Sequence, residues 1–234
     1  MRPALNAVAA QLLLVPSLVF ASTWEIDSAH SNASFAIKHM MVSTVRGQLG
    51  KVSGTVQIDD KDVTRSTVEA TVDVTGIDTG QPSRDTDLKS PNFFDVAKYP
   101  TITFKSTRIK KGAGNHLAVT GDLTMHGVTK PVTLAVTYSP TEAKDPQGHI
   151  KRGATATARV NRKDFGLNWN KALETGGVIV GDDVDITIDV ELAKSTGSDA
   201  KGAPPSEPRS PGSYFTALTR GRLSSLASSG LATD

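Results

Sequence analysis

Apolar and polar residues alternate with a period of two along most of the chain between residues 22 and 194. The clearest runs, each with an apolar residue at every second position, are 33–39, 68–74, 117–125, 132–138 and 184–192. Shorter runs of the same kind lie at 24–26, 56–58, 102–104 and 154–160. Because successive side chains of a strand point to opposite faces of the sheet, the pattern predicts about eight or nine strands with one apolar face each.

Strands with one apolar and one polar face are typical of antiparallel sheets, since the strands of parallel sheets are covered on both faces. Segments with the composition of hairpin turns separate the runs at 59–62, 111–115, 126–127 and 145–148. Gly47, Gly50 and Gly54 lack the spacing of a phosphate-binding loop, so we interpret them as hairpin glycines. Two irregular stretches remain: residues 81–89 predict a short helical turn, and 163–181 have no clear pattern.

Two architectures fit this series, a two-sheet sandwich and a closed barrel. Short hairpins between consecutive strands favour the barrel. We therefore predict an all-β fold, an antiparallel up-and-down barrel of about eight strands with one or two short helices. The residues expected to face inward are mostly small, including Val68, Ala70, Val72, Ala154 and Ala156. A filled barrel of this size needs larger side chains, so the sequence predicts an apolar cavity that fits one small ligand.

The first 21 residues have the features of a secretory signal peptide: one arginine, an apolar stretch and small residues before a cleavage point after Ala21. The alternative is a membrane anchor, but Asn6, Gln11 and Pro16 interrupt the apolar run. We expect an exported domain over 22–194 that has no membrane span once the signal is removed.

Composition changes after residue 194. Residues 195–234 begin with a stretch rich in Ser, Gly and Pro, which predicts a disordered tail. A short helix over 214–226 that contacts a partner or a membrane is the alternative interpretation.

The 234 residues contain no cysteine, which excludes disulfides, thiol catalysis and Cys-based metal sites. The 26 basic and 24 acidic residues nearly balance and form no basic stripe. Nucleic-acid binding is therefore not expected.

Candidate catalytic and metal-binding groups are sparse. Five histidines, at positions 30, 39, 116, 126 and 149, include no HExxH pair. His30, His39 and His126 could still meet in space, so a zinc site at these three is the alternative interpretation. A Ser31–His39–Asp122 triad can be drawn, but no GxSxG motif supports it. We predict no metal, no cofactor and no catalytic site. His39 shares its predicted face with Phe35 and Ile37, so it is either a polar group at a cavity mouth or a core histidine.

Aromatic residues gather beside the two irregular stretches. They are Phe93, Phe94, Tyr99, Phe104, Phe165 and Trp169. They either plug the barrel ends or form the wall or lid of a lipid pocket.

Several segments together resemble the YceI-like family from about residue 23 to residue 192. They are Trp24-Glu25-Ile26-Asp27 with Ala29-His30-Ser31, the run from Phe35 to Met40, Arg84-Asp85 with Leu88-Lys89-Ser90, Phe93-Phe94-Asp95-Val96 with Tyr99-Pro100, Ile102-Thr103-Phe104, Gly121-Asp122-Leu123-Thr124 with His126-Gly127-Val128-Thr129, and Asn161 to Leu167. Leu49 and Ala154 depart from the family pattern, where Phe is expected. Both changes shrink an apolar side chain and so alter the expected pocket shape.

The resemblance implies a lipocalin-like barrel, exported to the periplasm, that encloses a long amphiphile such as a polyisoprenoid or a fatty-acid derivative. We expect the residues along the ligand tail to be Phe35, Ile37, Phe104, Val119, Leu123 and Met125. Phe93, Phe94 and Trp169 are expected near the opening, with His39 and Arg84 as polar contacts.

The leading hypothesis is a lipid carrier or storage protein that is not an enzyme. One alternative is an enzyme acting on such lipids with His39 or Asp122 as base. Another is a stress-response module without a stoichiometric lipid. Whether the protein forms a homodimer is left open.

Overall fold

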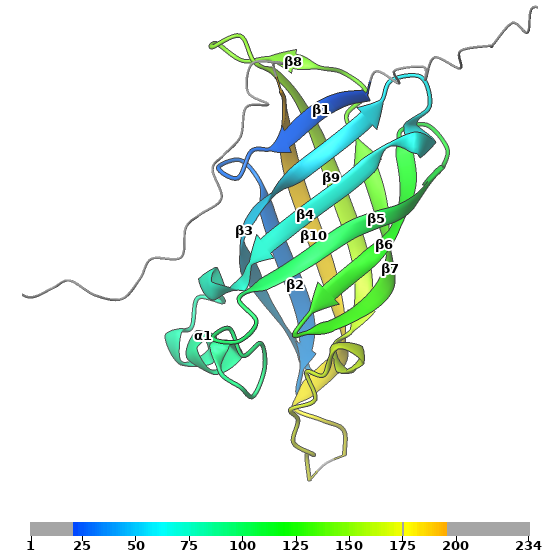
Figure 1. The fold of residues 1–234 in the computed structure, drawn as a ribbon. Coiled ribbons are helices and arrows are strands. Elements are labelled where there is room, and N and C mark those ends of the chain that lie inside the picture. Colours follow the sequence, from blue (N-terminus) through cyan, green and yellow to red (C-terminus); the bar gives the residue numbers. More distant parts are fainter. Residues whose placement is uncertain (1–20, 175, 196–234) are drawn as a thin grey trace, which may run out of the picture. The chain divides into compact units, whose positions relative to one another are not determined.

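A computed structural model describes residues 21–174 and 176–195; the predicted signal peptide up to residue 20 and the tail from 196 to 234 lie outside these residues. Ten strands form one sheet (Figure 1). They are β1 (Ala21–Ile26), β2 (Asn32–His39), β3 (Ser43–Asp59), β4 (Thr67–Asp73), β5 (Thr101–Lys111), β6 (His116–Met125), β7 (Val128–Tyr138), β8 (Ala143–Lys144), β9 (Ile150–Asn161) and β10 (Val180–Lys194).

Eight of these strands close into an antiparallel barrel. The hydrogen-bonded order runs β2-β3-β4-β5-β6-β7-β9-β10, and β10 pairs again with β2. The two extra strands, β1 and β8, lie at one end. The predicted all-β barrel of about eight strands is therefore confirmed, and the sandwich alternative is wrong.

Strands β1 and β2 share the space between β3 and β10. Residues 21–25 of β1 pair with the end of β3, and Trp24–Ile26 pair with the end of β10. Farther along the same two neighbours, β2 pairs with the start of β3 and with most of β10. The turn between β1 and β2 thus lets one stretch of chain close the barrel over its whole length.

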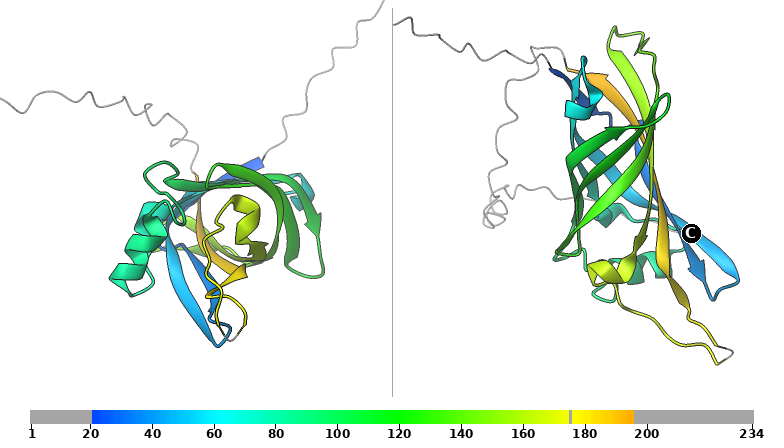
Figure 2. Two further views of the ribbon diagram at one scale, coloured as in Figure 1. Left: turned by 90° about the horizontal axis from the view of Figure 1, so that it is seen from below. Right: turned by 90° about the vertical axis from the view of Figure 1, so that its right-hand side faces the viewer.

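Helical segments gather mainly at one end of the barrel. Helix α1 (Pro82–Lys89) and the 3-10 helices η2 (Val74–Gly76) and η3 (Arg162–Phe165) lie there, together with the β2–β3 hairpin. Figure 2, viewed from that side, shows η3 lying across the barrel interior. The opposite end carries β1, β8 and the 3-10 helix η1 (Val63–Arg65). We call these the α1 end and the β1 end.

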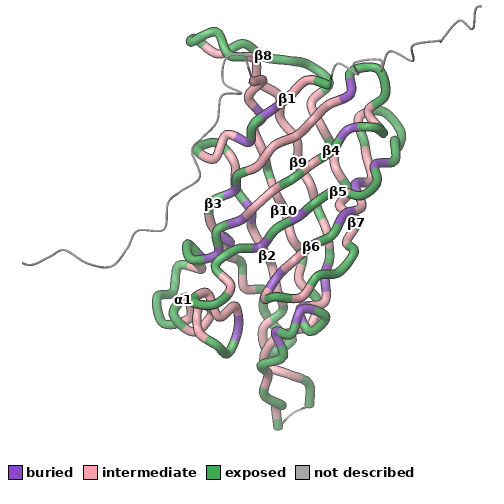
Figure 3. The backbone as a smooth tube through the Cα atoms, in the orientation of Figure 1, coloured by how far each residue is buried: buried purple, intermediate pink, exposed green. Residues whose placement is uncertain are grey.

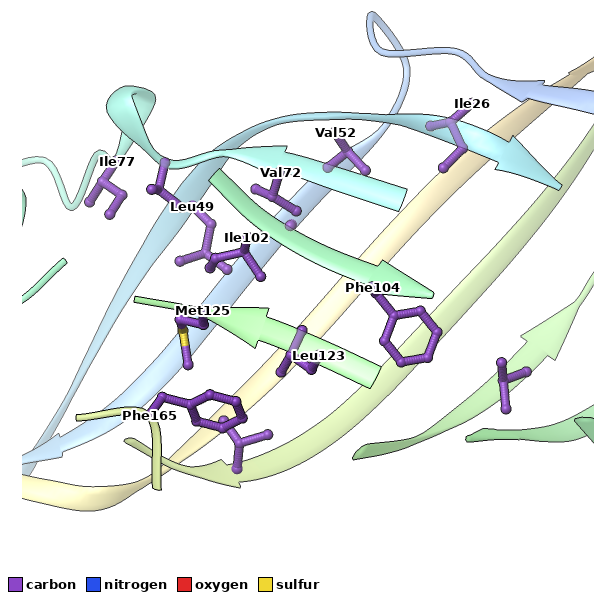
Figure 4. Close-up of a cluster of buried hydrophobic side chains, with 14 of the residues drawn as sticks. Ile26, Leu49, Val52, Val72, Ile77, Ile102, Phe104, Leu123, Met125 and Phe165 are labelled. Atoms are coloured by element: carbon purple, nitrogen blue, oxygen red, sulfur yellow. The ribbon is translucent and has the colours of Figure 1, made fainter. Parts of the chain in front are cut away.

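Buried residues lie on the inner face of the barrel, in the alternation that the sequence predicts. Figure 3 shows buried and exposed positions following one another along single strands. Figure 4 shows Ile102 and Phe104 on β5 with Leu123 and Met125 on β6 in one cluster of buried side chains. The sheet therefore has a continuous apolar interior, although the barrel is not completely filled.

Strand β3 is where the sequence interpretation fails. It is 17 residues long and contains Gly47, Gly50 and Gly54 within the strand, so their interpretation as hairpin glycines is wrong. Gly50 and Gly54 have φ of +130° and +146°. A Cβ atom at Gly50 would lie 1.9 Å from the carbonyl oxygen of Asp73, and one at Gly54 would lie 2.1 Å from that of Glu69. These glycines let β3 bend against β4 without breaking the pairing, as glycine does at sharp strand bends.

Replacing Gly50 with alanine tests this explanation. The added Cβ must displace backbone and hold a φ that alanine rarely adopts, so we expect a loss of about 2–4 kcal/mol in the free energy of unfolding, measured by urea denaturation.

Gly153 on β9 is the matched control, because its nearest neighbour to a new Cβ is the carbonyl oxygen of Val190 at 3.9 Å. Gly153→Ala should leave the free energy of unfolding within about 0.5 kcal/mol. Equal effects of the two substitutions would show that β3 does not need its glycines.

Candidate lipid-binding cavity

The barrel encloses a cavity of about 600 Å³. Ligand pockets in proteins commonly have volumes of about 300–1,000 Å³, so this space suits one small molecule or one hydrocarbon chain. Its walls come from all eight barrel strands and from α1. Most of the lining side chains are aliphatic or aromatic.

Small side chains create the space. Ala154, Ala156 and Ala158 on β9 and Ala70 on β4 line the cavity where larger residues would fill it. Leu49 and Ala154, the two departures from the family pattern, also belong to the lining. Their reduced size therefore bears directly on the cavity's shape.

Each side chain that we predicted to contact a ligand lies on the cavity wall. These residues are Phe35, Ile37, His39, Arg84, Phe93, Phe94, Phe104, Val119, Leu123, Met125 and Trp169. They come from β2, α1, the segment after α1, β5, β6 and the loop after η3. The structure thus brings the set together, and contact with a ligand stays a prediction.

Trp169 marks the place where the cavity meets solvent at the α1 end. It lines the cavity, yet 37% of its surface is exposed. Its ring packs against Phe93, with 5.3 Å between the centroids. His39 at the end of β2 and Arg84 on α1 line the same end. This arrangement agrees with the expected grouping of aromatic and polar residues beside an opening.

Arg84 is held in place by its neighbours. Its Nε donates to Oγ1 of Thr79 at 2.7 Å, and Nη2 donates to the Thr79 carbonyl oxygen at 3.0 Å. Thr79 in turn donates from its hydroxyl to the Asp85 carboxylate at 2.5 Å. The positive charge is therefore preorganised at the cavity wall.

A second arginine on the cavity wall, Arg162, is the first residue of η3 and is not among the site residues predicted from the sequence. Arg162 is only 3% exposed, and its Nε donates to the Gly181 carbonyl oxygen at 2.8 Å. Its guanidinium also donates to the carbonyl oxygens of Leu167 and Val180. Burial lowers the pKa of this guanidinium from its ordinary value. Arg162 thereby ties the loop after η3 to the start of β10.

At the β1 end, two charged side chains lie over a buried indole ring. Trp24 is fully buried, with the Arg152 guanidinium 5.0 Å and the Lys194 ammonium 5.3 Å from its ring centroid. Arg152 also lines the cavity and donates to Glu142 at 2.8 Å. Arg152 and Arg162 continue the series of every second residue that contains the inward-facing positions 154, 156, 158 and 160. This alternation could have identified both arginines as inward-facing from the sequence.

The two candidate catalytic bases lie on different sides of the wall. Asp122 is exposed on the outer face of β6 and is absent from the cavity lining, whereas His39 lines the cavity. Ser31 bonds instead to the backbone of Glu191. No Ser31–His39–Asp122 triad forms, and Asp122 is not positioned to act on a molecule in the cavity.

Asp27, His30 and Glu191 are the metal-ligating side chains that converge among the described residues. The Lys151 ammonium already lies between them, 2.7 Å from Asp27 and 3.0 Å from Glu191. His30 and His39 with His126, the set that we considered from the sequence, is not such a group. We interpret the cluster as an ion-pair network that joins the β1–β2 turn to β9 and β10.

Comparison with known proteins places the chain in a family. The model of the YceI-like domain matches residues 24–192. The chain belongs to the YceI-like family. A UPF0312 protein of Staphylococcus aureus (strain N315) is 34% identical over 174 residues, which cover 74% of this chain and 99% of that protein.

Solved structures agree with the YceI-like fold. BcnA of Burkholderia cenocepacia superposes with a TM-score of 0.62 and is 27% identical, covering 71% of this chain and 98% of BcnA. A domain from Saccharophagus degradans described as polyisoprenoid-binding has a TM-score of 0.55 at 14% identity, covering 74% of this chain and 98% of that domain. The latter likeness shows the fold alone.

Within residues 21–174 and 176–195 of this YceI-like chain, no helix is long and apolar enough to cross a membrane.

Replacing Lys151 with methionine tests the ion-pair network. Lys151, followed by His30, holds the pKa of Asp27 well below its usual range. A depressed carboxyl pKa stabilises the fold above the unfolded value of about 4, and this stabilisation is lost as the pH falls. We expect Lys151→Met to cost about 1–2 kcal/mol at pH 7, and the difference from wild type to shrink between about pH 5 and pH 2.

Thermal unfolding across that pH range provides the measurement. Lys110→Met on β5 serves as the control, because Lys110 is exposed and far from the network in the strand order. A pH-independent difference between wild type and Lys151→Met would contradict the assignment.

Proposed function

We propose that this protein binds a long-chain amphiphile, a polyisoprenoid or fatty-acid derivative, inside the barrel for carriage or storage. The observation that carries the proposal is the 600 Å³ cavity with an almost wholly apolar wall. Burial of a hydrocarbon tail contributes about 0.8 kcal/mol per methylene, so ten methylenes outweigh a typical cost of ordering a ligand. The Saccharophagus domain supports the choice of ligand class by fold-level analogy only.

In this proposal the eleven predicted residues divide by position. The apolar members on β2, β5 and β6 surround the tail, and Phe93, Phe94 and Trp169 surround the opening. His39 and Arg84 contact the polar head group. The domain extends over 22–194, and residues 1–21 direct export to the periplasm and are removed.

Native mass spectrometry of the full chain, purified without detergent, is the first test. We expect a near one-to-one adduct of an unmodified amphiphile, recovered intact in an organic-solvent extract. Removal of the ligand should lower the unfolding temperature, because a ligand that binds only the folded state stabilises it. A chain that carries no lipid and takes up none from added fatty acid would contradict the proposal and favour a module without a stoichiometric lipid.

The enzyme alternative makes a different prediction at His39. If the barrel only binds, His39→Ala changes the affinity for the ligand, and the ligand is returned chemically unchanged. If His39 is a general base, incubation with the bound lipid yields a new product in wild type and none in the variant. Chromatography of the extracted lipid before and after incubation separates the two.

Leu123→Arg tests which side of β6 faces the ligand. Leu123 is 9% exposed and lines the cavity, so an arginine there places a charge against the tail. We expect a loss of at least about tenfold in affinity for a fluorescent fatty acid. Asp122→Arg is the control, since it places the same side chain on the outer face and should leave the affinity unchanged.

Ala156→Phe is a second test of the ligand's position, which remains available if the Leu123→Arg variant does not fold. Ala156 lines the cavity on β9. A phenyl ring there fills part of the space without adding a charge, so long acyl chains should lose affinity more than short ones. An equal effect on all chain lengths would contradict the placement of the tail.

A further inference from the structure

The large exposed apolar side chains of the described residues gather at one end of the barrel. They are Met40, Met41, Val42 and Trp169, which are 44%, 60%, 84% and 37% exposed. The first three form the turn of the β2–β3 hairpin, and Trp169 lies in the loop after η3. Figure 2 shows this hairpin and this loop projecting at the same end of the barrel. Single exposed apolar residues are ordinary, but a group confined to one tip indicates a contact surface.

The hairpin turn holds its apolar residues in an unfavourable conformation. Met40 and Met41 have φ of +50° and +62°, and the Val42 amide donates to the His39 carbonyl oxygen at 3.2 Å. This is a turn with two left-handed residues, for which Asn-Gly is strongly preferred. Bulky side chains are strained there, and such strain is concentrated at functional sites. Folding alone would favour a different sequence at this turn.

The tip adjoins the cavity mouth. His39, the residue before the turn, and Trp169 both line the cavity. The Met40 amide donates to the Ile179 carbonyl oxygen at 2.7 Å, which joins the hairpin to the loop after η3. A surface that contacts the tip therefore also lies against the opening through which a ligand would enter.

We propose that Met40, Met41, Val42 and Trp169 form a docking tip that inserts into the surface of a lipid bilayer and places the cavity mouth against it. The proposal rests on the proposed function, which supplies a reason for the contact. Tryptophan favours the interface between lipid and water, and flexible methionines suit a disordered apolar phase. Lys38 and Arg46, both exposed, flank the turn with positive charge, which suits anionic lipids.

A lipid surface explains the tip better than a second copy of the chain. A standard protein interface buries about 800 Å² on each partner, from 20 to 30 residues. Four partly exposed side chains supply far less than that. A shallow insertion into a bilayer needs only a few apolar residues.

The test replaces the strained turn with one that favours the same fold. Met40→Asn with Met41→Gly removes two apolar side chains and supplies the preferred residues, so the unfolding temperature should rise by about 2–4 °C. Flotation with vesicles of phosphatidylethanolamine and phosphatidylglycerol (3:1) should show at least about a tenfold loss of binding. Met40→Leu with Met41→Leu keeps the apolar surface and should retain binding. All three chains are prepared with identical segments outside residues 21–195, so any affinity of those segments for vesicles is common to them.

Three further readouts separate this proposal from the one on which it rests. Affinity for a soluble dansyl fatty acid without vesicles should be equal in wild type and the Asn-Gly variant, while transfer of that probe from vesicles should slow in the variant. Because Trp24 is fully buried, a blue shift of tryptophan emission on adding vesicles reports Trp169. If wild type binds vesicles through the hairpin but takes up no probe, the docking tip stands and the proposed function fails.

Undiminished vesicle binding by the Asn-Gly variant would overturn the docking tip. So would sedimentation showing that wild type is a dimer which the same substitutions dissociate, since the turn would then be a contact between copies.

Discussion

Closure of the sheet is the constraint on which the rest of this structure depends. Pairing of β10 with both β2 and β9 removes every edge from the eight-stranded ring, so the backbone hydrogen bonds are satisfied without a packed centre. A chain without cysteine must hold the barrel by these bonds, by ion pairs and by the inner apolar layer. The ring can therefore tolerate alanines at positions 154, 156 and 158, where an open sheet would need large side chains to cover its face. The cavity is a consequence of closure.

The two ends of the barrel are built from different contacts. At the β1 end, Trp24 is buried beneath Arg152 and Lys194, and Lys151 joins β9 to the β1–β2 turn. At the α1 end, short helices and a loop replace continuous strands, and Trp169 is partly open to solvent. Ion pairs and cation–π contacts gather at the β1 end. The α1 end uses aromatic residues and the backbone hydrogen bonds of Arg162, and Trp169 there lies on the cavity wall and partly in solvent.

Much of the fold follows from the sequence because each strand has one polar and one apolar face. The resulting alternation of apolar and polar residues, with a period of two, is a strong indication of a strand. The same signal fails on β3, where Gly47, Gly50 and Gly54 interrupt the alternation and resemble turn residues. The need for glycine there arises from the approach of β4, a long-range contact that no local pattern contains. The candidate cavity residues on β2, β5 and β6 follow from their inward alternation, whereas Phe93, Phe94 and Trp169 follow from the clustering of aromatic residues beside the irregular stretches. Arg152 and Arg162 follow the same alternation on and just after β9 but are not predicted as inward-facing. A charged residue at the end of an apolar run is ordinarily interpreted as the end of the strand.

In the β2–β3 hairpin, the residues present differ from those that the turn conformation itself prefers. Two methionines occupy left-handed positions that a hairpin fills more favourably with Asn-Gly. A local change would relieve this strain without touching the barrel interior, since the turn projects beyond the ring of strands. Retention of a less stable turn at the mouth of an apolar cavity is readily explained if the exposed side chains have a partner there. Because the barrel supplies the stability, its rim can carry residues that a turn optimised for stability would not contain.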